Sequence, residues 1–242
     1  MTVKPYTQEE SKKAQVEQMF DNIAPTYDVL NRSTSMGTDV RWRKKMIAKL
    51  KSEKPRKILD VATGTADVAI AMAKQLQPER IVGLDLSAVM LSYGQKKIQK
   101  KNLTDIIELV QGDSEQLPFE DDSFDAVTVS FGVRNFENLE KGLAELLRVT
   151  RPGGQIVVLE FSKIGFAPLR WLFNLYFGYI MPLIGRLSSK DPRAYKYLFE
   201  SVQEFPSGRE FTGILRRLGY KQATCQPLSF GIASIYSAYK PS

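Results

Sequence analysis

Acidic residues stand at the ends of short apolar runs, in positions where a nucleotide-like ligand could bind. The segment ILDVATGTADVAIAMA places an apolar run ending near Asp60, a turn with Gly64 and a helical pattern in that order. This arrangement binds nucleotides at the carboxyl end of a strand. Asp85 ends the next run, 21 residues after Gly64, and a carboxylate there can accept hydrogen bonds from both hydroxyls of a ribose. Asp113 ends the third run, where an adenine amino group could be met.

The turn around Gly64 limits which nucleotide can bind. Gly64 lets the backbone approach a ligand closely, and Ala62 and Ala66 are small enough to permit the same. The dinucleotide fingerprint G-x-G-x-x-G is not met, because the turn holds one glycine, so we expect no pyrophosphate cradle. The alternative for this segment alone is an ordinary tight turn between a strand and a helix.

The chain has no histidine among its 242 residues, which excludes several chemistries. A Ser–His–Asp triad, a Cys–His pair and a histidine-ligated zinc site cannot be built, and we expect no metal site. Any general base must be a carboxylate, a tyrosine, a lysine, a water or the substrate. The single cysteine, Cys225, excludes an intramolecular disulfide and fits a reducing compartment. The N-terminus shows no signal-peptide pattern, so we expect a cytoplasmic protein.

Short runs rich in valine and isoleucine alternate with helical patterns from residue 56 onward. This alternation predicts the α/β class, a doubly wound and mostly parallel sheet with helices on both faces. Two β-like runs near the C-terminus, KQATCQPL and SIYSAYK, predict an antiparallel hairpin. We expect a single domain made of a helical lid (1–50), a ligand-binding core (55–160), an apolar helical insertion (164–204) and a closing hairpin region (205–242).

The motifs of the core resemble those of the class I S-adenosylmethionine-dependent methyltransferases. The matching residues are Asp60-x-x-x-Gly64-Thr65, Asp85, Gly112-Asp113, Pro118-Phe119 with Ser123-Phe124-Asp125, and Arg151-Pro152-Gly153-Gly154. The resemblance implies a Rossmann-like fold and S-adenosyl-L-methionine as the cofactor. It also implies cofactor contacts from Gly64, Thr65, Asp85, Asp113, Ser114 and Ser130.

Further segments resemble one branch, the quinone-biosynthesis C-methyltransferases, which act on demethylmenaquinone and, in some members, on a ubiquinone precursor. The N-terminal match is Phe20-Asp21-x-Ile23-Ala24-x-x-Tyr27-Asp28-x-Leu30-Asn31, followed by Ser35-x-Gly37 and Trp42-Arg43. Later matches are Ser130-Phe131-Gly132-x-Arg134-Asn135, Leu159-Glu160-Phe161-Ser162 and Tyr195-x-Tyr197-Leu198-x-x-Ser201-Val202-x-x-Phe205-Pro206. The resemblance implies methylation of a ring carbon of a polyprenylated quinol, with demethylmenaquinol as the substrate. The alternatives are a ubiquinone precursor and another small phenolic or lipid substrate.

Three polar residues of these motifs are candidates for the chemistry of ring methylation. The ring must be electron-rich, so a quinol hydroxyl has to lose or share its proton while the ring carbon and the methyl donor are held in line. We expect Arg134 to stabilise the resulting phenolate-like oxygen, Tyr27 to orient the ring and Asn135 to act beside them. The alternative for Arg134 is a structural salt bridge, and for Tyr27 it is ordinary packing of the lid.

One position departs from the pattern of the branch. Its members usually carry a histidine three residues before the tryptophan, whereas this chain has Asp39 before Trp42. Either that histidine is dispensable or Asp39 takes its role. Asp39 is also placed to cap the second helix of the lid.

Basic residues are concentrated in one segment. Residues 41–57 hold nine Lys and Arg and one Glu, whereas the net charge of the whole chain is +7. The rest is close to neutral, so we expect no nucleic-acid partner and keep an RNA-binding module only as the non-enzymatic alternative. The apolar stretch 171–185 is too short to span a bilayer, and with the basic segment it predicts peripheral contact with the inner face of the cell membrane. The alternatives are core packing for the apolar stretch and a solvated helix face for the basic one.

Overall fold

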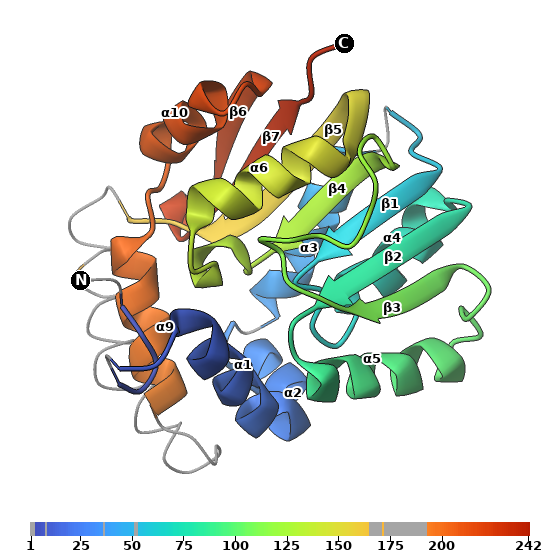
Figure 1. The fold of residues 1–242 in the computed structure, drawn as a ribbon. Coiled ribbons are helices and arrows are strands. Elements are labelled where there is room, and N and C mark those ends of the chain that lie inside the picture. Colours follow the sequence, from blue (N-terminus) through green and yellow to red (C-terminus); the bar gives the residue numbers. More distant parts are fainter. Residues whose placement is uncertain (1–2, 8, 36, 51–52, 165–170, 172–192) are drawn as a thin grey trace.

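A twisted sheet forms the centre of the molecule (Figure 1). The computed structural model describes residues 3–7, 9–35, 37–50, 53–164, 171 and 193–242. Within them, seven strands are ordered β3-β2-β1-β4-β5-β7-β6. The strands are β1 (Lys57–Val61), β2 (Arg80–Asp85), β3 (Ile107–Gln111), β4 (Phe124–Ser130), β5 (Thr150–Phe161), β6 (Lys221–Leu228) and β7 (Ala233–Tyr239).

The first five strands are parallel to one another, whereas the last two make antiparallel pairs. β7 runs antiparallel to β5, and β6 runs antiparallel to β7. A short 3-10 turn, η4 (Ser229–Gly231), joins these last two strands. The doubly wound sheet and the closing hairpin predicted from the sequence are therefore confirmed.

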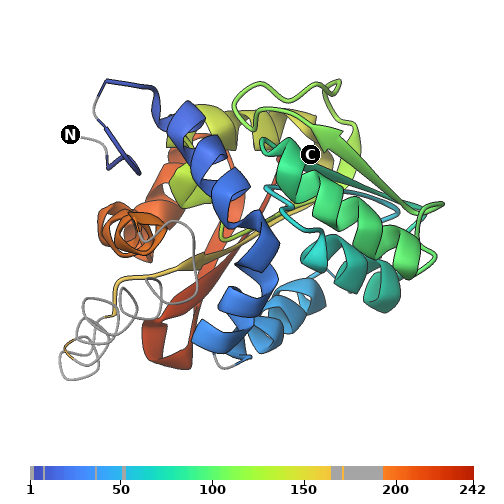
Figure 2. The same ribbon diagram turned by 90° about the horizontal axis from the view of Figure 1, so that it is seen from below.

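Helices cover both faces of the sheet (Figure 2). One face carries α3 (Thr38–Ala48), α4 (Asp67–Leu76) and α5 (Ala88–Lys100), and the other carries α6 (Leu139–Val149) and α10 (Arg209–Arg217). On β1, the fully buried Ile58 belongs to the core under α3 and α4, and the fully buried Leu59 belongs to the core under α6 and α10. Because side chains alternate along a strand, a strand buried on both faces reads as a continuous apolar run.

The N-terminal helices lie at the end of the sheet toward which the parallel strands point (Figure 1). They are α1 (Lys12–Ile23), a 3-10 turn η1 (Ala24–Thr26) that contains Pro25, and α2 (Tyr27–Thr34). α9 (Arg193–Glu204) packs beside α1, where Val16 and Met19 cluster with Ala194 and Tyr197. These helices therefore lie over the carboxyl ends of the strands.

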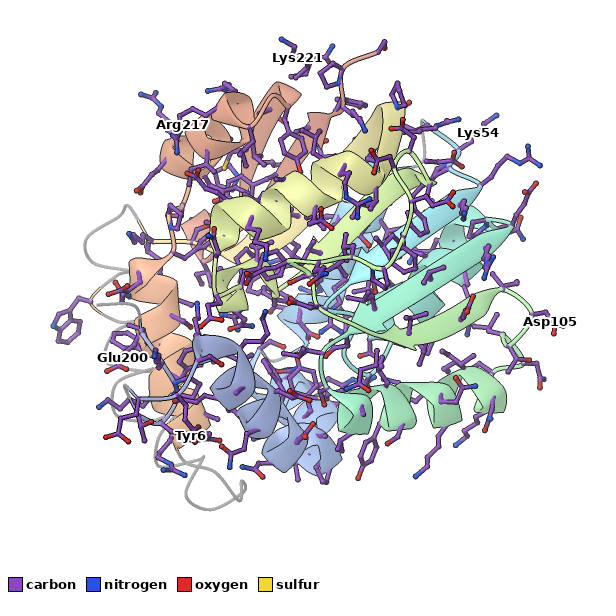
Figure 3. All side chains as sticks on the ribbon, viewed as in Figure 1. Tyr6, Lys54, Asp105, Glu200, Arg217 and Lys221 are labelled. Carbon is purple, nitrogen blue, oxygen red and sulfur yellow. The ribbon has the colours of Figure 1, made fainter. Side chains whose placement is uncertain are left out.

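Figure 3 marks the two ends of the molecule by labelled side chains. Tyr6, which precedes α1, and Glu200, on α9, lie at the lid end, and the Arg193 guanidinium stacks 4.2 Å from the centre of the Tyr6 ring. Lys54 and Lys221 lie at the opposite end (Figure 3). The chemistry predicted from the sequence belongs to the lid end, because that end holds the carboxyl ends of the parallel strands.

The prediction that Asp39 caps a helix is wrong. Gly37 is the N-cap of α3 and adopts the left-handed conformation at φ 72°, so the chain enters the helix earlier than expected. Asp39 lies in the first turn, where its buried carboxylate accepts a hydrogen bond from Ser35 Oγ at 2.7 Å. The predicted apolar insertion (164–204) lies mostly outside the described residues, apart from residues 164 and 171 and α9.

Candidate functional site

A cavity opens at the carboxyl ends of β1, β2 and β4 and is covered by α1. It is partly open to solvent and is lined by both apolar and polar side chains, as small-molecule sites are. Most of the predicted site residues line it, namely Tyr27, Gly64, Asp85, Asp113, Ser114, Ser130 and Asn135. Thr65 and Arg134 are not among the lining residues, and each is held instead by groups behind the wall of the cavity.

Asp85 joins two loops at the floor of the cavity. Its Oδ2 accepts a hydrogen bond from the Gly64 amide at 2.7 Å, and its Oδ1 accepts one from the Ser87 amide at 3.0 Å. Burial raises the pKa of the Asp85 carboxyl, and these amide hydrogen bonds oppose the rise. A carboxylate has about four lone-pair positions, so it keeps acceptor capacity for the hydroxyls of a ribose.

Gly64 has a backbone conformation that other residues rarely adopt. Its φ is 56°, and a β-carbon at this position would lie 4.0 Å from the Tyr27 ring. The left-handed conformation directs the Gly64 amide at Asp85 and keeps the backbone bare on the cavity side. The close approach of a ligand to Gly64 stays a prediction.

Asp113 carries a contact that the sequence did not suggest. Lys13 of α1 reaches its Oδ2 at 2.5 Å, and the Glu115 amide donates to its Oδ1 at 2.9 Å. The hydrogen bond from Lys13 to Asp113 raises the pKa of that lysine. The lid thus contacts the same carboxylate that the sequence assigns to an adenine.

Ser130 supplies the test of whether the cavity fits a cofactor. Its hydroxyl oxygen is buried at the cavity wall and has no hydrogen-bond partner among the described residues. A buried hydroxyl without a partner is costly, so a polar ligand that bonds it is favoured. Together with the remaining acceptor capacity of Asp85, this orphaned hydroxyl fits a ligand with several hydroxyl, amino and carboxylate groups.

Thr65 belongs to a charged network beneath the lid rather than to the cavity. Its hydroxyl donates to Asp28 Oδ1 at 2.6 Å, and Lys97 Nζ lies 3.0 Å from the same hydroxyl and 2.9 Å from Asp28 Oδ2. Lys97 also pairs with Asp67 at the start of α4. Asp28 of α2 engages the Thr65 hydroxyl in this structure, and the contact of Thr65 with the cofactor stays a prediction.

Asp39 belongs to the same charged network beneath the lid. Arg43 pairs with Asp67 at 3.0 Å and with Asp39 at 3.6 Å, so Asp39 joins α3 to α4 through a shared guanidinium. Asp39 is buried and does not line the cavity. The geometry gives it a structural role in the lid.

The turn η2 (Val133–Asn135) follows β4 and carries two of the predicted catalytic residues. Arg134 Nη1 donates to Glu160 Oε1 and to the Phe131 carbonyl, both at 2.7 Å. Glu160 is fully buried, and burial raises the pKa of its carboxyl while Arg134 opposes the rise. The salt bridge named as the alternative for Arg134 is therefore present, and Arg134 Nε is buried without a hydrogen-bond partner among the described residues.

Asn135 and Tyr27 reach the cavity from two sides. The Asn135 side-chain oxygen accepts a hydrogen bond from the Tyr197 hydroxyl of α9 at 3.2 Å. The Tyr27 ring packs edge-on against Phe20, with 6.0 Å between the ring centres. Burial raises the pKa of the Tyr27 hydroxyl, which keeps it a donor at neutral pH. The structure therefore brings both predicted residues to the same cavity.

Sequence reasoning missed the residues that hold the site together, chiefly Lys12, Lys13, Glu160 and Tyr197. Glu160 and Tyr197 lie inside the motifs that resemble the quinone-biosynthesis branch, so their motif positions were a usable signal. Lys12 and Lys13 gave no signal, because two adjacent lysines at a helix start read as a solvated surface. Across the described part of the chain, no group of three or more acidic or cysteine side chains could hold a metal ion.

Comparison with known proteins gives one family. The sequence matches the model of the ubiE/COQ5 methyltransferase family over residues 8–240. The demethylmenaquinone methyltransferase of Bacteroides fragilis is 44% identical over 238 residues, which cover 98% of this chain and 97% of that protein. The ubiquinone/menaquinone biosynthesis C-methyltransferase UbiE of Geotalea daltonii is 41% identical over 95% of this chain and 97% of that protein.

Solved structures support the fold. A SAM-dependent methyltransferase of Thermotoga maritima, described as a possible histamine N-methyltransferase, matches with a TM-score of 0.65 over 93% of this chain and 99% of that chain. At 15% identity, that likeness extends to the fold alone. The family model spans residues 8–240, and the two relatives align with this chain over nearly their whole length. This chain therefore belongs to the ubiE/COQ5 methyltransferase family.

Proposed function

We propose that this methyltransferase moves the methyl group of S-adenosyl-L-methionine to a ring carbon of a polyprenylated quinol, with demethylmenaquinol as the substrate. The observation that carries the proposal is one cavity lined by two sets of polar residues. We call Asp85, Asp113 and the orphaned Ser130 hydroxyl the cofactor side, and we assign Tyr27 and Asn135, which line the same cavity, to the quinol. The names of the relatives from Bacteroides fragilis and Geotalea daltonii support a quinone substrate.

The residues of the cavity divide the cofactor among them. Asp85 would hold the ribose hydroxyls, and Asp113 with the Ser114 amide would address the adenine. Gly64 and the backbone of Thr65 would approach the methionine moiety, and Ser130 would complete its hydrogen bonds there. When bound, the cofactor supplies an electrophilic methyl group on a positively charged sulfur.

The residues of the η2 turn and the lid prepare the ring for attack. A quinol oxygen that loses or shares its proton donates density to the ortho carbon, which then becomes the nucleophile. We assign the stabilisation of this oxygen to the positive charge of Arg134, whose guanidinium lies behind the cavity wall and keeps donors that Glu160 and Phe131 do not engage. Asn135 lines the cavity beside it, and the protonated Tyr27 hydroxyl orients the ring. Water then takes the proton from the methylated ring carbon, which restores the aromatic quinol.

A methyl-transfer assay tests this function. The protein is incubated with methyl-labelled S-adenosyl-L-methionine and demethylmenaquinol, and the extracted lipid is analysed by mass spectrometry. We expect labelled menaquinol. A benzoquinol precursor of ubiquinone and a simple phenol, offered separately, cover the alternative substrates. Label in one of these, and none in the naphthoquinol, would contradict the proposed substrate while leaving the methyltransferase assignment intact.

We also propose peripheral contact with the inner face of the cell membrane, where such a substrate resides. Four basic side chains of α3 and its C-terminal cap are exposed, and no described carboxylate pairs with them: Arg41, Lys44, Lys45 and Lys49. Arg43, within the same segment, is turned inward to Asp67, so only part of the basic run can meet a surface. Each exposed basic residue near an anionic surface contributes about 1 kcal/mol.

Apolar side chains accompany this basic face. Phe230 of η4 is 87% exposed, and the adjacent Ser229 accepts a hydrogen bond from the Trp42 indole of α3 at 2.9 Å. Of the described helices, none has both the length and the apolar character to cross a membrane. Flotation with vesicles containing anionic lipid tests the contact, and we expect binding that falls with salt and in an Arg41→Gln/Lys44→Gln/Lys45→Gln variant. Equal flotation of that variant would contradict this contact.

The proposed domain organisation follows from the same assignments. The lid (1–50) and the core (55–160) both contribute to the cavity, and the closing region (205–242) supplies the last strands of the sheet. We assign the insertion (164–204) to covering the substrate, because its described helix α9 sends Tyr197 to Asn135.

A further inference from the structure

The lid is fastened to the η2 turn by one buried lysine. Lys12 is 6% exposed, and its Nζ donates to the Arg134 carbonyl at 2.8 Å and to the Phe136 carbonyl at 2.9 Å. These two carbonyls lie on either side of Asn135 in the chain. The Lys12 amide also donates to Glu137 Oε1 at 2.8 Å. Lys12, the first residue of α1, therefore donates hydrogen bonds to the backbone on both sides of Asn135, which lines the cavity.

The following residues of the same helix contact the cofactor side of the cavity. Lys13, Val16 and Phe20 line it, and Lys13 binds Asp113. Adjacent residues of α1 thus reach the η2 turn and the carboxylate assigned to the adenine. Because a helix moves as a rigid unit over this length, the lid cannot shift over the cavity without also moving Lys12 relative to the turn.

Charged groups from three sides face the Lys12 ammonium. Burial lowers its pKa to about 8, and Arg134 contributes to this lowering, whereas Glu115, Glu137 and Glu204 oppose it. These carboxylates come from the loop after β3, the segment after η2, and α9. At neutral pH the ammonium is charged, and its attraction for the two carbonyls is lost progressively as the pH rises through 8.

We propose that Lys12 is a positioning residue that couples seating of the lid over the cofactor to placement of the η2 turn. Its ammonium holds the carbonyls of Arg134 and Phe136, so the turn presents Asn135 to the substrate only when α1 is seated. The proposal rests on the proposed function, in which Arg134 and Asn135 act on the quinol. Lys12 itself does not touch the substrate.

Steady-state kinetics of Lys12→Met test the catalytic consequence, with the exposed Lys141→Met on α6 as the matched control. We expect a roughly 10- to 100-fold lower kcat, because misplacement of a catalytic group by about 1 Å has that effect. The cofactor Kd should change less than the kcat, because Lys13 and Asp113 remain paired. The ratio of wild-type to variant kcat should shrink as the pH rises through 8. A pH-independent ratio, or an unchanged kcat, would overturn the proposal.

Hydrogen exchange supplies a readout that needs no quinol. With S-adenosylhomocysteine bound, we expect the amides of residues 133–137 to exchange faster in Lys12→Met than in wild type, and other amides to be unchanged. In Lys141→Met we expect the same exchange rates as in wild type. Protection of the turn that is equal to wild type would refute the positioning role, even if the quinol proves not to be the substrate. If Lys12→Met does not fold, Lys12→Gln, which keeps one donor group, replaces it in both measurements. Conversely, the wild-type protein could be inactive on quinols while Lys12→Met still exchanges faster than wild type in the turn. That result would count against the proposed function alone.

Discussion

The cofactor side of the cavity and the η2 turn are supported in different ways. Asp85 and Asp113 each accept a hydrogen bond from an amide two residues further along the chain. The η2 turn is held by Lys12 and Tyr197, which lie 122 and 62 residues away from their partners in the turn. The first arrangement follows from the local course of the chain. The second depends on how two helices pack against the end of the sheet.

A pair of buried carboxylates shows a second difference between the two regions. Asp60, on β1 just before the Gly64 turn, is bonded by the hydroxyls of Thr63 at 2.7 Å and Thr128 at 2.6 Å. Glu160, behind the η2 turn, is bonded by the Arg134 guanidinium at 2.7 Å. Burial raises the pKa of both carboxyls, and that of Asp60 reaches about 6. Asp60 thus has neutral partners, whereas Glu160 has a cationic one. Replacing each carboxyl by its amide should therefore change the free energy of unfolding in opposite directions.

Removal of Arg134 should have the largest effect. We expect Arg134→Ala to lower kcat by roughly 100-fold or more, because the positive charge next to a developing oxyanion is lost, with little change in cofactor Kd. The same change leaves the Glu160 carboxylate buried without its cation, which should lower the free energy of unfolding by about 3–5 kcal/mol. Turnover, calorimetry with the cofactor, and urea unfolding measure the three quantities.

A double variant separates the two roles of Arg134. Arg134→Met/Glu160→Gln removes both charges, so much of the stability should return while turnover stays low. Recovery of turnover along with stability would mean that Arg134 is only structural. Equal losses of turnover and cofactor affinity in Arg134→Ala would also rule out the oxyanion assignment.

Replacement of Asp85 tests the cofactor side. Asp85→Asn removes the charge that would bind two ribose hydroxyls, and hydrogen bonds to charged groups contribute about 1.5–3 kcal/mol each. We expect the cofactor Kd to rise by roughly 100-fold in calorimetry. Asp105→Asn, in an exposed loop, is the control and should bind normally. Retention of wild-type affinity by Asp85→Asn would remove this residue from the site.

Asp60 should show the opposite behaviour to Glu160 on neutralisation. Its folded pKa of about 6 lies above the ordinary value of 3.8, so the folded state binds the proton more tightly. Stability from this group is present at low pH and is lost as the pH rises through 6. Asp60→Asn cannot ionise at this position, so it does not lose this stability. Between about pH 4 and about pH 8, its free energy of unfolding should therefore rise relative to that of wild type by about 2–3 kcal/mol.

Urea unfolding across this pH range measures the Asp60 effect. Glu160→Gln serves as the counterpart, since it leaves Arg134 buried without a carboxylate and should lower the free energy of unfolding. A difference between Asp60→Asn and wild type that does not vary with pH would contradict the raised pKa.

The smallest effect is expected at Tyr197. Tyr197→Phe removes the hydroxyl that bonds the Asn135 side chain, and a typical hydrogen bond contributes about 0.5–1.5 kcal/mol. We therefore expect a few-fold lower kcat and an unchanged cofactor Kd. Tyr239→Phe removes an exposed hydroxyl that bonds Glu53 and should match wild type. An unchanged kcat in Tyr197→Phe would show that α9 does not help to position Asn135.

Sequence patterns were enough to predict the sheet, its helices and the meeting of Gly64, Asp85 and Asp113 in one cavity. Apolar runs buried on both faces predict parallel strands, and the carboxyl ends of such strands must meet at one edge. Asp85 and Asp113 could therefore be placed near Gly64 from the order of the runs, and all three line the cavity. The motif around Arg134 and Asn135 was also readable. These features depend on residues close together in the chain or on a simple topological rule.

The contacts that each of these side chains makes came from the three-dimensional packing of the chain. Packing turned the Thr65 hydroxyl to Asp28, paired Arg134 with Glu160, and joined Arg43 of α3 to Asp67 of α4. It also brought Lys12 to the η2 turn. Several of these contacts join residues tens to more than a hundred positions apart, and they form because a buried charge must find a partner wherever packing brings one. No local pattern in the sequence specifies that meeting.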